Sequence, residues 1–159
     1  MDVGGFDRRY PTSEDYYLWL RIVSKHPIVR VPQVLAYYHH HEGLRATQNR
    51  SNMAINHWRV QREFLSNNPD LDSVISSERK RKLTHGELLQ RGYEAYWSDD
   101  LPSARKIFRL VMRHGYGTWS DWLRMLPSVL PIRLHRTLAD YGNLHGCSRF
   151  RRRRNIGIR

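Results

Sequence analysis

The chain has 159 residues, of which 40% are apolar and 26% are charged, and its formal net charge is +12. This composition is typical of one folded domain and excludes a disordered chain. No apolar stretch approaches the ~18 residues that a bilayer span requires, and the N-terminal residues lack the apolar region of a signal peptide, so we expect a soluble, cytoplasmic protein. The single cysteine excludes an internal disulfide and a cysteine-rich zinc site.

The positive charge is concentrated at the C-terminal end. Residues 101–159 contain 13 Lys or Arg and 2 Asp or Glu, whereas residues 1–50 and 51–100 have net charges of +2 and −1. Arginines between 149 and 159 carry much of the excess. Such a run repels itself and binds polyanions without selecting among them, so we expect residues 142–159 to form a basic, flexible tail.

The first predicted element is a helix that follows a glycine-rich turn at residues 4–7 (GGFD). Thr12 or Ser13 can cap this helix, and two acidic residues fall in its first turn, where the helix dipole favours negative charge. Its apolar residues form a buried stripe. We expect the helix to end near Lys25, because the residue before a proline avoids the helical region and a His-Pro pair follows.

Two short extended segments are predicted next. Residues 28–31 and 34–38 are β-branched or aromatic runs on either side of a Pro-Gln pair. They lead directly into three consecutive histidines at 39–41. The sequence therefore predicts a small β element near residues 28–41.

Helical periodicity dominates the rest of the chain. The predicted helices cover residues 53–65, 74–97, 103–114, 119–130 and 134–141. Residues 86–114 predict a helical hairpin, because Gly92, Tyr96, Ala104 and Phe108 have the spacing of a tetratricopeptide unit. One unit cannot bury a solenoid core, so we interpret the hairpin as a helical appendage packed on its neighbours.

The acidic pair in the first helix is one candidate for chemistry. Adjacent side chains on a helix point about 100 degrees apart, so Glu14 and Asp15 cannot both face one partner. On spacing alone, a pair that only favours the helix dipole is the more common case. In the functional interpretation, Asp15 is a general base that accepts a proton from a hydroxyl group.

The histidine triplet is a second candidate. Side chains alternate along an extended segment, so His39 and His41 share one face and could bind a divalent metal. Two ligands are a weak signal, and ordinary polar surface is the more common case. The sequence contains no zinc-protease, zinc-ribbon, phosphate-loop or dinucleotide-binding motif.

Four segments in order resemble the C-terminal part of family 2 glycosyltransferases. They are residues 4–9 (GGFDRR), 13–21 (SEDYYLWLR), 31–38 (VPQVLAYY) and 41–43 (HEG). The resemblance covers residues 3 to about 48. It implies that residues 1–50 are the C-terminal segment of a GT-A catalytic domain, an α/β remnant that is mainly α, and that residues 51–141 are a helical extension.

The resemblance also implies roles for individual residues in an inverting transfer from a nucleotide-diphospho-sugar to an acceptor hydroxyl. Asp15 matches the catalytic base, and Glu14 would orient it or touch the acceptor. Substrate-binding positions match Gly4, Gly5, Phe6, Asp7 and Arg21. His41, with His39, matches the position that approaches a divalent metal, Mg or Mn, and the diphosphate.

Two departures from the family pattern bear on this interpretation. His39 stands where the family has an arginine, and imidazole lacks the bidentate fork of a guanidinium, so we expect a weaker phosphate contact. The nucleotide site of the family lies upstream of the glycine turn. We therefore expect a fragment that is inactive alone and that needs a missing N-terminal half, as a truncated or split gene would produce. Its partners would be the donor and a glycan or lipid-linked acceptor.

Two alternatives remain from the sequence. The first is a basic helical protein that binds nucleic acid or an anionic membrane surface through residues 101–159. A tail of this charge would also place a glycosyltransferase at the inner face of the membrane as a peripheral protein. The second is an interaction bundle at residues 51–141, with the N-terminal motif as a vestige.

Overall fold

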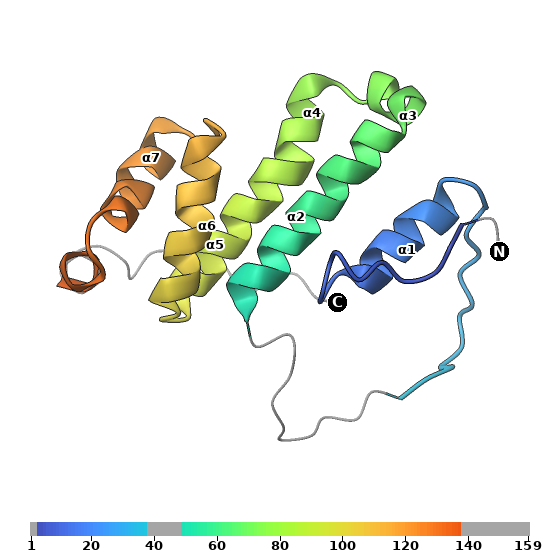
Figure 1. Ribbon diagram of the computed structural model, residues 1–159, viewed down its shortest axis with the longest axis horizontal. Helices are drawn as coiled ribbons and strands as arrows, with labels where there is room; N and C mark the ends of the chain where they lie inside the picture. Colours follow the sequence, from blue (N-terminus) through green and yellow to red (C-terminus); the bar gives the residue numbers. More distant parts are fainter. Residues whose placement is uncertain (1–2, 38–48, 138–159) are drawn as a thin grey trace.

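The described part of the chain is mainly helical. The computed structural model describes residues 3–37 and 49–137 (Figure 1). Its elements in chain order are α1 (Glu14–Val23), α2 (Arg50–Asn67), α3 (Pro69–Val74), α4 (Ser77–Arg81), the π-helical turn η2 (Lys82–Gly86), α5 (Glu87–Trp97), α6 (Leu101–Arg113), α7 (Trp119–Met125) and the 3-10 turn η3 (Leu126–Val129). Residues 132–137 are also helical. The mainly helical class predicted from the sequence is confirmed.

The longer helices form a row in which α2 lies between α1 and the run from α4 to α5. Figure 1 shows α2 beside the run from α4 to α5, with α6 and then α7 on one side and α1 on the other. The predicted helix at 74–97 is divided in the structure, because α3 ends at Val74 and Ser76 begins a new helix by accepting a hydrogen bond from the backbone N–H of Arg79. Within the described residues, no helix combines the length and the apolar character needed to cross a bilayer.

Helices α5 and α6 form the most extensive helix–helix contact in the described part of the chain. Ala104 and Phe108 on α6 are fully buried, and the ring of Phe108 meets Tyr93 edge-on at 5.3 Å. A Cβ atom on Gly92 would lie 2.7 Å from Phe108, so this position of α5 tolerates only a hydrogen. The predicted hairpin is confirmed, and its glycine lets the two helices approach closely.

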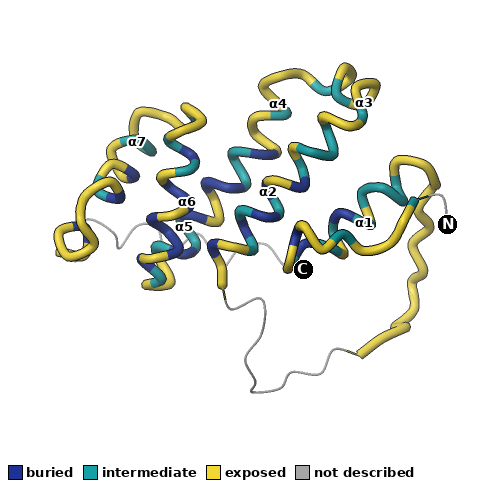
Figure 2. The backbone as a smooth tube through the Cα atoms, in the orientation of Figure 1, coloured by how far each residue is buried: buried dark blue, intermediate teal, exposed yellow. Residues whose placement is uncertain are grey.

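The same hydrophobic cluster connects the hairpin to α2 and α7. Trp58 of α2 and Met125 of α7 are buried in it. Figure 2 shows buried positions, in dark blue, along these helices. A capping box between Thr118 and Asp121 begins α7, and the Tyr93 hydroxyl donates a 2.7 Å hydrogen bond to Asp121. Helices α2, α5, α6 and α7 therefore share one core.

The predicted β element is not seen in its described part. Residues 28–37 form no strand, and large apolar side chains such as Val29 (81% exposed) and Val34 (77% exposed) face solvent. A strand is stabilised by hydrogen bonds to a neighbouring strand. Among residues 3–37 and 49–137 no such neighbour exists. Residues 38–41, the end of the predicted element, lie outside the described residues, as does the predicted tail at 142–159.

A second group of rings surrounds the π-helical turn. His85 contacts Trp58, His114 and Tyr116 with ring-centroid distances of 5.7, 5.2 and 5.9 Å. Burial, together with the positive charges of His114, Arg62 and Arg81, lowers the pKa of His85 to about 4. Because protonation is disfavoured there, His85 packs as a neutral ring at neutral pH.

We expect Gly92→Ala to destabilise the protein by about 1–3 kcal/mol, although alanine is the better helix former, because the new methyl group clashes with Phe108. Gly86→Ala is the matched control. Its Cβ would meet the hydroxyl end of Tyr116, which can move aside, so its unfolding free energy should stay within about 1 kcal/mol of the wild type. Urea unfolding measures both. Equal effects of the two substitutions would contradict the proposed packing.

The low pKa of His85 predicts a loss of stability in acid. As the pH falls from about 6.5 toward 4, the unfolded chain takes up a proton at this histidine and the folded chain does not, so the unfolding free energy declines. His85→Phe keeps a ring and should make this decline shallower in denaturant titrations at several pH values. His26→Phe changes an exposed histidine and should leave the decline as it is. An unchanged slope in His85→Phe would contradict the assignment.

Candidate active site

The first turn of α1 carries both predicted catalytic residues, and the structure separates them. Asp15 is exposed, and its carboxylate accepts a 2.7 Å hydrogen bond from the backbone N–H of Tyr16. Glu14 is half-buried, and its Oε2 atom is buried without a hydrogen-bond partner in the described part of the chain. Two adjacent carboxylates therefore lie in different environments, as the helical geometry predicted.

The backbone just before α1 is strained. Thr12 has φ = +75°, a left-handed conformation that is rare for a β-branched residue and costs of order 1–3 kcal/mol. Ser13 occupies the N-cap position, which confirms the predicted helix start. However, its side chain makes no capping hydrogen bond, and its Oγ atom is buried without a partner among residues 3–37 and 49–137.

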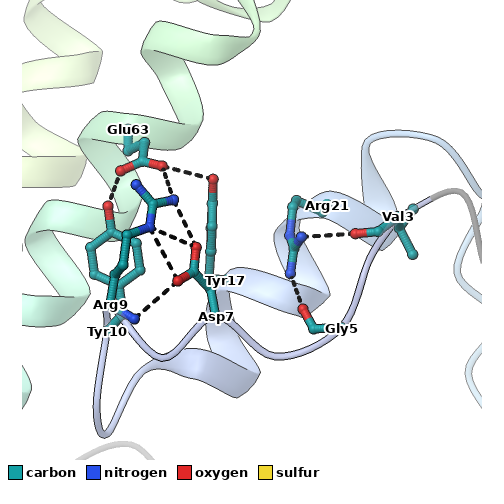
Figure 3. A network of polar contacts seen from close by, with 8 residues as sticks. All are labelled: Val3, Gly5, Asp7, Arg9, Tyr10, Tyr17, Arg21 and Glu63. Atoms are coloured by element: carbon teal, nitrogen blue, oxygen red, sulfur yellow. Dashed lines mark hydrogen bonds and ion pairs between the residues drawn. The ribbon is translucent and has the colours of Figure 1, made fainter.

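The glycine turn is held by Arg21. The guanidinium of Arg21 donates hydrogen bonds to the carbonyl oxygens of Val3, at 2.8 Å, and of Gly5, and it lies over the ring of Tyr17 (Figure 3). Gly4 has φ = +69°, and a Cβ there would lie 3.1 Å from Arg21. A Cβ on Gly5 would meet open space. The structure thus shows that Arg21 stabilises the glycine turn. The contact between Arg21 and substrate that the sequence suggested stays a prediction.

Asp7 pairs with Arg9, which in turn reaches α2. The Arg9 guanidinium donates to the Asp7 carboxylate at 2.7 Å and to Glu63 of α2 at 2.8 Å. Hydrogen bonds from Arg9 hold the pKa of Asp7 below its usual range. Phe6, the remaining predicted substrate-binding residue, is 67% exposed.

Glu63 is the centre of the network that attaches this region to α2. Besides Arg9, it accepts hydrogen bonds from the hydroxyl groups of Tyr10 and Tyr17, the latter at 3.0 Å (Figure 3). Both tyrosines are buried, and their rings meet edge-on at 5.3 Å. One carboxylate of a helix that is distant in sequence therefore contributes directly to the position of α1, and with it to that of Asp15.

Sequence reasoning missed a histidine beside the candidate base. The ring of His57, on α2, stacks on Tyr16 at 3.8 Å, and its Nε2 lies 3.6 Å from Glu87. Burial lowers the pKa of His57, while the charges of Glu87 and Asp15 act in the opposite direction. Asp15 and His57 are thus close enough to interact electrostatically. No spacing in the sequence connects them, because the fold brings α1 onto α2.

The metal-binding prediction falls outside the described residues, since His39 and His41 lie in the segment 38–48. In residues 3–37 and 49–137, no group of three His, Cys, Asp or Glu side chains could hold a metal ion.

A hollow of about 380 Å³ at the starts of α2 and α6 is lined by Asn49, Ser51, Asp100, Pro102, Ser103 and Lys106. None of these lining residues belongs to the predicted site.

Comparison of the chain with protein-family models, with curated proteins and with solved structures found no match.

Removing the Glu63 carboxylate should detach the N-terminal segment. Glu63→Ala leaves the buried hydroxyls of Tyr10 and Tyr17 without their acceptor, and we expect a loss of about 2–4 kcal/mol in unfolding free energy. Amide hydrogen exchange should also accelerate in α1. Glu94→Ala, which removes surface contacts with Arg91 and Gln90, should cost less than about 1 kcal/mol. Unaltered exchange in α1 of Glu63→Ala would refute the anchoring role.

Proposed function

We propose that residues 3–37 form the acceptor side of a glycosyltransferase site, with Asp15 as the general base. The observation that carries the proposal is the position of Asp15, which is exposed in the first turn of α1. It forms no ion pair within the part of the chain that the structure describes. The helix dipole favours a negative charge there, and an unpaired carboxylate can accept a proton.

The glycine turn supports an acceptor site on this side. Gly5 has open space where a side chain would be, and Arg21 holds the turn by its carbonyl oxygens. A sugar hydroxyl could therefore approach the backbone without steric hindrance. The exposed ring of Phe6 offers an apolar surface of the kind on which sugar rings pack.

The exposed extended segment supports a site that is completed by further residues. Residues 28–37 carry β-branched and aromatic side chains that face solvent. In the proposed enzyme, this segment becomes one of the short strands of the GT-A remnant by pairing with a sheet that belongs to the nucleotide-binding half. In this proposal the described residues supply one wall of the site and the nucleotide-binding half supplies the other.

In the proposed reaction, Asp15 accepts the proton of an acceptor hydroxyl while that oxygen attacks the anomeric carbon. The new C–O bond forms as the bond to the nucleoside diphosphate breaks, and the diphosphate leaves with the bonding electrons, which inverts the configuration. The Oε2 atom of Glu14 is buried, so in this proposal a hydrogen bond from the acceptor to Glu14 would use the other carboxylate oxygen, Oε1. A divalent metal would stabilise charge on the leaving diphosphate.

The decisive experiment joins residues 3–159 to the nucleotide-binding half of a family 2 glycosyltransferase and measures transfer from a labelled nucleotide-sugar. We expect donor-dependent transfer that Asp15→Asn reduces by about 100-fold or more, since general-base catalysis contributes ~10²–10⁴. Asp70→Asn, an exposed aspartate of α3, is the control and should keep full activity. A folded chimera that binds nucleotide but gives no transfer, or transfer unaffected by Asp15→Asn, would contradict the proposal.

A further inference from the structure

Helix α7 has a second apolar face that no described part of the chain covers. Trp119, Leu123 and Leu126 are spaced at i, i+4 and i+7, and they are 78%, 55% and 57% exposed. They share one side of the helix, whereas Trp122 and Met125 pack into the core. The side chains on the inward side are enough to attach α7 to the core. Packing within the described chain therefore does not explain why the outward side is also apolar.

The apolar surface continues through the turn that follows. We call the whole set the α7 face, and it consists of Trp119, Leu123, Leu126, Val129, Leu130, Ile132 and Leu134, all of them exposed. It lies at the end of the molecule opposite α1 (Figures 1 and 2).

Two arginines of α6 hold this surface in place. Arg109 donates hydrogen bonds to the carbonyl oxygens of Ser128 and Val129, at 2.8 and 3.2 Å, and the buried Arg105 lies 3.4 Å from the Nδ1 atom of His135. Ser128 and His135 are themselves buried. The exposed apolar side chains therefore project from an anchored backbone, so a partner could bind them without first ordering the segment.

The stretch of the chain that carries the α7 face is strongly positive. Residues 101–137 contain seven basic side chains and one acidic side chain. The basic residues are Arg105, Lys106, Arg109, Arg113, Arg124, Arg133 and Arg136. The single carboxylate, Asp121, is used by Tyr93 and Thr118. A partner that complements both the positive charge and the exposed apolar side chains is therefore anionic and also has an apolar region.

We propose that the α7 face binds the surface of an anionic phospholipid membrane, with Trp119, Leu123 and Leu126 in the boundary between headgroups and acyl chains. A bilayer supplies both requirements at once, because its acyl chains accept the apolar side chains and its headgroups attract the arginines. Nucleic acid would satisfy the charge but would leave the row of large aliphatic side chains without a matching surface. The proposal concerns the opposite end of the molecule from Asp15 and stands independently of the proposed reaction.

Vesicle flotation of the full chain tests the proposal. With vesicles of phosphatidylglycerol and phosphatidylcholine in equal parts, we expect binding at least about tenfold tighter than with phosphatidylcholine alone. The double variant Trp119→Ser and Leu123→Ser should bind the mixed vesicles at least about tenfold more weakly, because it loses apolar burial. Every arginine of the C-terminal residues is retained in this variant, so the loss reports on the α7 face alone.

The matched control is the double variant Val34→Ser and Leu35→Ser, which removes a pair of exposed apolar side chains from another part of the chain. It should bind the mixed vesicles like the wild type, and circular dichroism should show the same helix content in all three proteins. Unchanged binding by the α7 double variant would overturn the proposal. So would an absence of vesicle binding together with tight binding to duplex DNA or RNA.

Insertion itself is measured with a fluorophore. Leu123→Cys in a Cys147→Ser background provides one labelling site, because the chain has a single cysteine. An environment-sensitive dye at this position should shift to the blue on addition of anionic vesicles, whereas the same dye at Val34→Cys should not. Binding without a shift at position 123 would show that charge alone holds the protein and would overturn the insertion.

Discussion

The hydrogen bonds accepted by the carboxylate of Glu63 fix the position of the candidate site on the helical bundle. This carboxylate accepts hydrogen bonds from Arg9, Tyr10 and Tyr17, which lie 54, 53 and 46 positions earlier in the chain. Helix α1 has 10 residues and buries only Tyr17, and a helix of this length is marginal in water on its own. Packing and hydrogen bonding against α2 therefore supply the order that the local sequence does not. The orientation of Asp15 follows from this attachment.

The rest of the molecule is stabilised differently. The α5–α6 hairpin, α2 and α7 share a large apolar core, whereas the contact between α1 and α2 has a small one, built on Tyr10, Tyr17 and Val60. A polar network with buried hydroxyl groups fixes geometry more narrowly than apolar contact does, because a lost acceptor leaves a donor unsatisfied. The helical bundle thus acts as a scaffold. It presents the first turn of α1 at one end and the α7 face at the other.

The sequence predicted the helices well and their contacts poorly. The acidic first turn of α1 and the Gly92–Phe108 packing follow from local patterns, so both were predictable. The strands predicted within residues 28–37 are not present in the described chain, because β-branched residues favour a strand only where a neighbouring strand is present. Glu63 and His57 could not be assigned in advance, since on α2 they look like ordinary polar helix residues. Their roles arise from long-range packing, which a single sequence does not encode in any spacing.

The central claim is that the Glu63 network holds α1 so that Asp15 is presented to solvent, whereas the carboxylate of Glu63 is itself occupied by hydrogen bonds. Carbodiimide labelling of carboxyl groups, read by mass spectrometry on the folded chain, measures this directly. The account predicts that Asp15 is modified among the fastest carboxylates, and that Glu63 and Asp121, which accept hydrogen bonds from tyrosines, are modified slowly. Slow modification of Asp15, or modification of Glu63 as fast as that of Asp15, would contradict it.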